Sequence, residues 1–180
     1  FQQGGKGLKR VQLMGSGSIL REVIAAANIL SEDFDIKADV WSCPSFNELK
    51  RDGDDCVRWN LMHPDQKPRI PHVTACLEKH SGPVVAATDY VKLFADQIRA
   101  YVGRNYHVLG TDGFGRSDTR ASLRRHFEVN RYYVTVAALK TLADEGTIPT
   151  KTVKSAIRKS NAGCTPDRSF TTGPSVELKS

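Results

Sequence analysis

A glycine-rich segment at residues 110–118, GTDGFGRSD, contains the residue types that bind phosphate or a cofactor. It directly follows the apolar run 106–109, and open α/β sheets usually bind ligands where a strand ends. The same residues suit a tight turn, since the glycines can adopt positive φ and Phe114 can be tucked inward. Ser117 or Asp118 could then cap the following helix. We favour this structural interpretation.

Three arginines, the first of them within this segment, recur at every fourth position, a spacing that would place them on one face of a helix. With Arg125 and His126 beside them, they could bind a carboxylate, a phosphate or an acidic partner. A solvated surface is the commoner role of such a face. If the face binds anything, a partner protein is the better prediction. The candidate anion-binding or partner-contact residues are Gly113, Gly115, Arg116, Arg120 and Arg124.

A second glycine turn, Gly15-Ser16-Gly17-Ser18, joins a predicted strand to a predicted helix. Free backbone N–H groups at such a turn can bind phosphate. The dinucleotide fingerprint needs a third glycine, but Leu20 occupies that position, and the next strand is not followed by a ribose-binding acid. No Lys-Ser/Thr pair completes a P-loop. The commoner interpretation is a tight turn capped by Ser16 or Ser18.

The remaining reactive side chains build no self-contained active site. The five histidines lack metal-ligand spacing, no serine lies in a G-x-S-x-G elbow, and Asp54 and Asp55 would diverge by about 100 degrees on a helix. The four cysteines form no C-x-x-C pair, which favours reduced thiols in a cytoplasmic protein over a zinc cluster or a disulfide scaffold. We assign no catalytic, cofactor-binding or metal-binding residue.

The composition predicts one domain. A chain of 180 residues, 39% of them hydrophobic, can bury one substantial core, and no apolar run approaches the roughly 20 residues needed to cross a bilayer. The formal net charge of +6 would permit nucleic-acid binding, but the basic residues are interleaved with acids. We therefore expect neither nucleic acid nor a membrane as a partner. Because the chain starts at Phe1 rather than at Met, we expect a piece of a longer polypeptide.

Alternating strands and helices must position these segments. Apolar or alternating runs predict strands at 9–14, 36–42, 84–88 and 106–109. Helices are predicted at 19–30, 45–51, 55–61, 71–79, 90–102 (capped by Asp89), 119–127, 131–145 and 150–159, with an irregular connection up to 67. This order predicts an α/β fold of three layers, with a mixed, mostly parallel sheet and helices on both faces. We expect residues 1–8 to be a leader from an upstream linker, 9–160 the domain, and 161–180 a flexible tail.

Four motifs resemble the carboxyl-terminal region of the homodimeric, bacterial type of pyruvate dehydrogenase, the decarboxylating component of the pyruvate dehydrogenase complex. They are VQLMGSGSILREVIAAANIL, DVWSCPSFNELKRDGDDCVRWN, ATDYVKLFADQIRAYV and VLGTDGFGRSDTRASLRRHFEVN. The resemblance covers about residues 9–159. It implies a transketolase-type C-terminal domain, the third domain of a large homodimer, in which GTDGFGRSD is a structural signature.

In that family, thiamine diphosphate and magnesium are held between the first two domains, which also supply the groups that handle pyruvate. The resemblance implies that this chain binds no cofactor itself and that its role is structural. Its partners would be the catalytic domains of the same polypeptide, the homodimer partner and a dihydrolipoyl acetyltransferase, whose lipoyl group receives the acetyl group. We expect the isolated chain to be inactive. Two alternatives stay open: a freestanding nucleotide-binding α/β domain and a non-enzymatic protein-interaction module.

Overall fold

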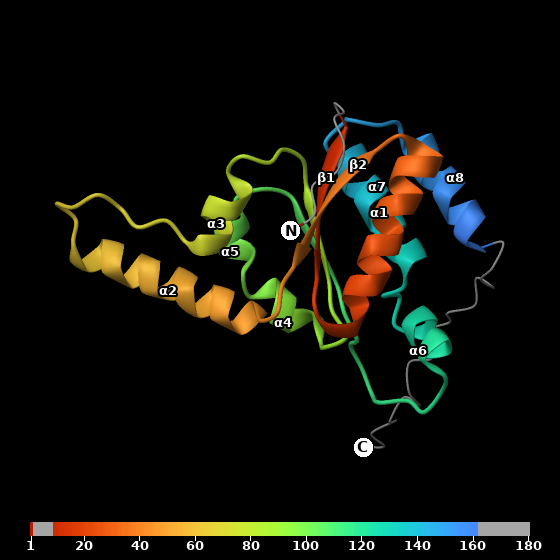
Figure 1. The fold of residues 1–180 in the computed structure, drawn as a ribbon, viewed down its shortest axis with the longest axis horizontal. Coiled ribbons are helices and arrows are strands. Elements are labelled where there is room, and N and C mark those ends of the chain that lie inside the picture. Colours follow the sequence, from red (N-terminus) through yellow and green to blue (C-terminus); the bar gives the residue numbers. More distant parts are fainter. Residues whose placement is uncertain (2–8, 162–180) are drawn as a thin grey trace, which may run out of the picture.

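The computed structural model describes Phe1 and residues 9–161, and its centre is a single sheet (Figure 1). The strands are β1 (Arg10–Gly15), β2 (Lys37–Ser42), β3 (Val84–Ala87) and β4 (Tyr106–Leu109). They lie in the order β2-β1-β3-β4, and each pairs with its neighbours in parallel. All four strand predictions are confirmed, because apolar runs such as the wholly buried β3 are typical of parallel strands covered on both faces.

Helices cover both faces of the sheet, which confirms the predicted α/β fold (Figure 1). One face carries α1 (Leu20–Phe34), α7 (Arg131–Asp144) and α8 (Thr150–Asn161), with α6 (Arg120–His126) near its lower end. The other carries α2 (Phe46–Met62), α3 (His72–Leu77), α4 (Lys92–Asp96) and α5 (Arg99–Val102). No helix in this described part is long and apolar enough to span a membrane.

Each face of the sheet has its own apolar core, because successive strand side chains point to opposite faces. Val11 and Leu13 of β1 belong to the core beneath α1 and α7, whereas Met14 belongs to the core on the α2 side. Gln12 is also fully buried, and its amide group donates to Asp39 Oδ2 (2.8 Å). Every buried side-chain nitrogen or oxygen in the described residues has a hydrogen-bond partner.

A single helix, α2, replaces the two short helices predicted at 45–51 and 55–61, and the irregular connection predicted up to residue 67 follows it. Gly53 is buried beneath the ring of Tyr101, where an added Cβ would come within 2.3 Å of Cε2. The Tyr101 hydroxyl donates to Asp54, and Lys50 forms an ion pair with the same carboxylate. This tertiary contact outweighs the poor helix propensity of the glycine and aspartates, so the predicted break was wrong. The long helix projects from the sheet as an arm (Figure 1).

The helix predicted at 90–102 is divided into α4 and α5. Asp89 does not cap it: α4 starts after Val91, and the Lys92 N–H donates to Asp112 Oδ1 (2.8 Å). The cap is thus supplied by the glycine-rich loop from 20 residues further along the chain. The prediction from local sequence chose Asp89 as the cap instead of Asp112, because the loops that follow β3 and β4 meet only in the folded sheet.

The division into a leader, a domain and a tail stays a prediction. Apart from Phe1 and Asn161, which ends α8, the expected leader at 1–8 and the expected tail at 161–180 lie outside the described residues.

Candidate functional site

The loops at the carboxyl ends of β1, β3 and β4 are joined by hydrogen bonds. Ser16 Oγ, after β1, donates to Thr88 Oγ1, after β3 (2.9 Å). Thr111 Oγ1, after β4, donates to the carbonyl oxygen of Asp89 (2.7 Å). The strand order reverses direction between β1 and β3, which is where open α/β sheets place ligands. These bonds make that edge a rigid frame.

The glycine turn after β1 is occupied by a carboxylate of the chain itself. Gly17 has φ of +51°, and a Cβ there would lie 3.2 Å from Asp89 Oδ1. Ser18 Oγ donates to Asp89 Oδ2 (3.2 Å). A phosphate in this position would be repelled by the negative charge of Asp89. Neither Ser16 nor Ser18 caps a helix through its side chain, so that prediction was wrong: both are used to join loops.

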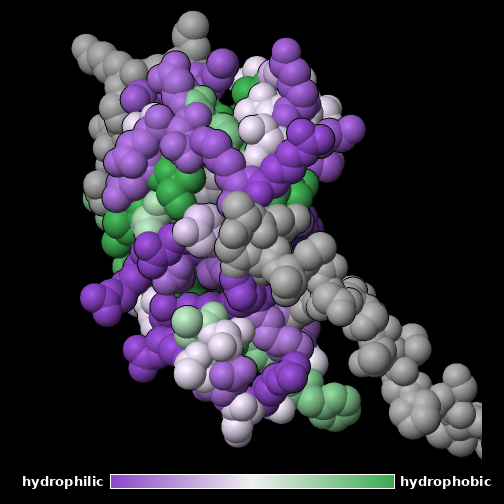
Figure 2. Space-filling view, turned by 90° about the vertical axis from the view of Figure 1, so that its right-hand side faces the viewer, coloured by the Kyte–Doolittle hydropathy of each residue, from purple (hydrophilic) through white to green (hydrophobic). Residues whose placement is uncertain are grey.

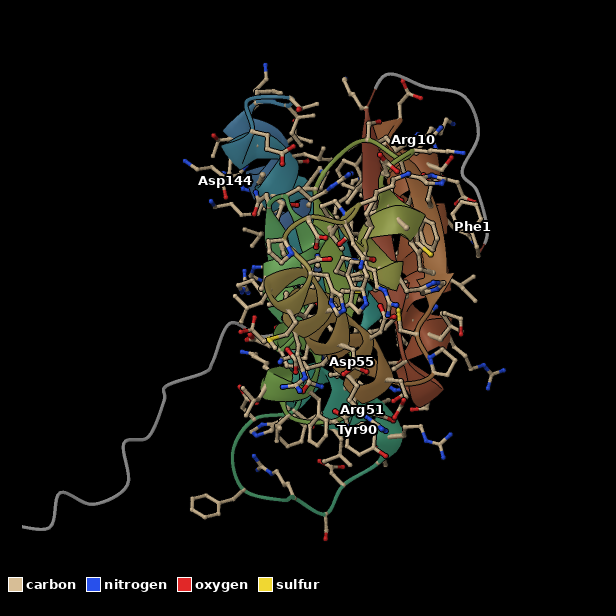
Figure 3. The ribbon with its side chains drawn as sticks, turned by 90° about the vertical axis from the view of Figure 1, so that its left-hand side faces the viewer. Phe1, Arg10, Arg51, Asp55, Tyr90 and Asp144 are labelled. Atoms are coloured by element: carbon tan, nitrogen blue, oxygen red, sulfur yellow. The ribbon has the colours of Figure 1, made fainter. Side chains whose placement is uncertain are left out.

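The GTDGFGRSD loop differs in detail from the tight turn predicted for it. Phe114 is not tucked inward but is 98% exposed. The cap of α6 is Thr119, whose Oγ1 accepts from the Ser122 N–H (3.3 Å), rather than Ser117 or Asp118. The loop projects from the lower end of the molecule, where Tyr90 also lies (Figure 3).

Two of the loop glycines are needed for different reasons, and neither involves a ligand. Gly113 has φ of +102°, a region that favours glycine. Gly110 does not have positive φ, but a Cβ there would come within 2.8 Å of the Lys92 nitrogen and the Tyr90 carbonyl oxygen. Its small size therefore lets two stretches of backbone approach closely.

The five candidate residues all line one cavity of about 340 Å³, which is also lined by Asp89, Phe114 and Phe127. The prediction that the three arginines share one helical face was wrong. Arg116 lies in the loop before α6, with Nη1 3.2 Å from His126 Nδ1. Arg120 is exposed at the first residue of α6, and Arg124 is turned toward α1.

Arg124 belongs to a partly buried ion cluster that sequence reasoning missed. Arg124 Nη1 donates to Glu22 Oε1 of α1 (3.0 Å), and Arg124 Nη2 reaches Ser18 Oγ (3.2 Å). Arg131, at the start of α7, donates to Glu22 from its backbone nitrogen and Nε, both at 3.0 Å, and from Nη2 at 3.2 Å. The cluster ties the first turn of α1 to α6 and α7, and its guanidinium groups are not all free for a partner.

The electrostatics of this cluster favour the charged forms of both partners. Burial alone would raise the pKa of Glu22, but the hydrogen bonds and positive charges of Arg131 and Arg124 outweigh it and hold the pKa below its usual range. The hydrogen bonds to Glu22 in turn raise the pKa of Arg131. One sequence signal existed: Glu22 lies beside Val23 and Ala26, apolar positions of α1 that are buried, so it had to be buried with a partner.

A second and larger cavity, of about 620 Å³, adjoins the cluster between α1, α6 and α7. Its lining residues are Glu22, Arg120, Ala121, Ser122, Arg124, Arg125, Asn130 and Arg131. Four arginines thus face one carboxylate. The three described cysteines, Cys43, Cys56 and Cys76, are free, and no group of three or more His, Cys, Asp or Glu residues in the described part could hold a metal ion.

Known proteins share this fold and these motifs. The profile of the family described as "Transketolase-like TK C-terminal domain" matches residues 2–130. Two solved transketolase structures are similar in fold. A split-gene transketolase described as an inactive β4 tetramer has a TM-score of 0.51 and 18% identity over 77% of this chain and 41% of that chain. The transketolase of Pichia stipitis has a TM-score of 0.50 and 19% identity over 78% of this chain and 17% of that chain.

The most informative relatives in sequence are proteins named pyruvate dehydrogenase E1 component. That of Cupriavidus necator is 60% identical over 152 residues, or 84% of this chain and 17% of the relative. Those of Pseudomonas aeruginosa and Escherichia coli K12 are 59% and 55% identical over 83% and 88% of this chain, and 17% and 18% of the relatives. The chain thus spans less than a fifth of the length of these relatives.

Proposed function

The chain belongs to the family of transketolase-like C-terminal domains, as its motifs predicted, and we propose that it serves as such a domain in a bacterial pyruvate dehydrogenase E1 component. The observation that carries the proposal is 55–60% identity to E1 components over most of the chain. The parent enzyme decarboxylates pyruvate oxidatively with thiamine diphosphate. It passes the acetyl group to lipoyl groups of a dihydrolipoyl acetyltransferase and acts as a homodimer in the cytoplasm.

At the carboxyl edge of the sheet, the described residues do not fit thiamine diphosphate and magnesium. A diphosphate needs N–H donors and positive charge, but Asp89 presents its carboxylate at the glycine turn after β1. The neighbouring cavity of about 350 Å³ at the ends of β1 and β3 has polar groups that already bond within the chain, including Ser16, Ser45 and Asn47. We therefore assign no catalytic step to the residues of this edge, and the charge of Asp89 argues against nucleotide binding at the glycine turn.

Exposed apolar side chains support a structural role against other domains. Four of them lie on the α2 arm and on the segment that returns from it: Val57, Leu61, Met62 and Ile70. Leu61 is 76% exposed. The returning segment is fixed to the arm, because Asn60 and the backbone of Arg69 exchange two hydrogen bonds (2.9 and 2.7 Å). Apolar groups on a projecting helix stabilise the protein only if a neighbour covers them.

A second exposed apolar group lies at the carboxyl end of the sheet. It comprises Tyr90, Val91, Leu93, Phe94 and Phe114. Figure 3 places Tyr90 at this lower end of the molecule. Together with the arm, this edge gives the domain two surfaces that neighbouring domains of a larger enzyme could cover.

A domain exchange tests the proposal. The chain would replace the matching segment of the Escherichia coli E1 component, and pyruvate-dependent acetyl transfer to the lipoyl acetyltransferase would be measured. We expect the chimaera to keep most of the parental activity, whereas the isolated 180-residue chain turns over no pyruvate when thiamine diphosphate and magnesium are added. Turnover of pyruvate by the isolated chain would contradict a supporting role. Capture of the acetyltransferase by the isolated chain, together with an inactive chimaera, would favour the interaction-module alternative.

A further inference from the structure

The cavity between α1, α6 and α7 has an excess of positive charge. Glu22 is the one carboxylate in its lining, and it is already bonded to Arg124 and Arg131. Arg120 and Arg125 are exposed and form no ion pair with any residue in the described part of the chain. Four guanidinium groups beside one carboxylate leave an excess of three positive charges around about 620 Å³. Such charges repel one another unless an anion lies between them.

Further hydrogen-bond donors border the same cavity. Asn130 uses its side-chain oxygen to cap α7, accepting from the Tyr132 and Tyr133 N–H groups (3.0 and 3.2 Å), and its amide nitrogen remains a donor. Ser122 adds a hydroxyl group. The arginine fork and these donors match the oxygen atoms of a phosphate group.

The lining also indicates the size class of the ligand. Apart from Ala121, it consists of polar or charged residues, whereas a protein partner would be expected to meet an apolar centre. The face that carries α6 and α8 is largely hydrophilic, with apolar atoms only in small patches (Figure 2). The large exposed apolar side chains of α2 and α4 lie on the other side of the sheet. The volume is in the range of small-molecule sites.

We propose that this cavity binds a small polyanion that carries phosphate groups, with Arg120 and Arg125 as the principal contacts. The set of anion-binding arginines thus differs from the one predicted from spacing. Arg116 is directed to His126 instead, and Arg124 serves mainly to neutralise Glu22. The proposal rests on the cavity alone and does not depend on the proposed function.

Calorimetric titration of the full 180-residue chain with inorganic pyrophosphate, at constant ionic strength and neutral pH, tests the proposal. We expect saturable binding of one pyrophosphate per chain. Arg120→Ala and Arg125→Ala should each weaken binding by about tenfold, the usual effect of losing one charge-assisted contact. The matched control is Arg58→Ala, which removes the same charge from an exposed position on α2, across the sheet. Because all three positions are exposed, the variants should keep the circular dichroism spectrum of the parent chain.

Three results would overturn the proposal. One is the lack of saturable binding. Another is equal weakening by Arg58→Ala, since pyrophosphate would then respond only to net charge. The third is that the chain does not bind pyrophosphate but captures the lipoyl acetyltransferase, and that this capture is lost when Arg120 and Arg125 are both replaced. The arginines would then bind an acidic protein partner.

Discussion

Replacing Glu22 by glutamine should destabilise the domain far more than its small change in volume would suggest. The carboxylate is 7% exposed and accepts four hydrogen bonds, three from Arg131 and one from Arg124. A glutamine keeps one acceptor oxygen, but its NH₂ group would face a guanidinium donor. The two cations would lose their counter-charge.

The expected loss follows from the exposure of the partners. Removing one member of a buried ion pair costs about 3–5 kcal/mol. Arg124 is 17% exposed, but Arg131 is 44% exposed and can be partly hydrated in the variant, so we expect the lower end, about 3 kcal/mol. For a domain of this size, that corresponds to a decrease in Tm of about 6–12 °C.

Urea unfolding followed by far-ultraviolet circular dichroism measures the difference in free energy of unfolding. The control is Glu32→Gln, the same substitution at an exposed position of the same helix, which should change stability by less than about 0.5 kcal/mol. If Glu22→Gln costs no more than this control, the ion cluster does not hold the helices together. A double-mutant cycle with Arg124→Ala should give a coupling of about 1–3 kcal/mol.

The effect of Glu22→Gln should also depend on pH. Because the folded-state pKa of Glu22 is lowered, its contribution is fully present above the unfolded pKa of about 4.3 and is lost as the pH falls through the lower folded value. The parent chain and the variant should therefore differ at pH 7 and become more similar as the pH falls below about 4. A difference independent of pH would mean that the loss of stability arises from packing instead of charge.

Three further results are expected. Gly53→Ala should lower the free energy of unfolding by about 1–2 kcal/mol in urea despite the better helix propensity of alanine, because the new Cβ would lie 2.3 Å from the Tyr101 ring; a gain in stability would mean that the ring moves freely. Phe114→Ala should change stability by less than about 0.5 kcal/mol, since the side chain is 98% exposed; a loss above about 1 kcal/mol would indicate an inward Phe114. Burial raises the pKa of Cys43 to about 12, so iodoacetamide at pH 8 should alkylate Cys43 more slowly than the less buried Cys76 in the folded chain, as measured by peptide mass spectrometry; equal rates would contradict that burial.

The sheet could be predicted from sequence because each strand carries its own signal. The run Val84–Ala87 is apolar throughout, and a continuous apolar run is the pattern expected of a parallel strand that is buried on both faces. The helix α2 could not be predicted with the same success, because Gly53 and its neighbouring aspartates are locally poor helix formers. They are held in the helix by Tyr101, which lies 47 residues from Asp54 in the chain.

For the candidate site too, contacts between residues far apart in the chain could not be predicted. The arginine spacing indicated a basic region around α6, and the predicted residues line one cavity. Spacing could not show that Arg124 pairs with Glu22, which is 102 residues away, or that Arg131 joins the same cluster. The exposure of Phe114 was also beyond local reasoning, since an aromatic residue between glycines fits a buried turn equally well.

The ion cluster has a consequence for the order of events during synthesis. Glu22 leaves the ribosome with the first strand and helix, but the backbone and side chain of Arg131 that neutralise it follow 109 residues later. At about 5–20 residues per second, that interval is roughly 5–20 s. During this time α1 cannot bury its carboxylate against a partner, and its apolar face has no α7 to cover it. We therefore expect that the first half of the domain does not fold as a separate unit before α7 emerges.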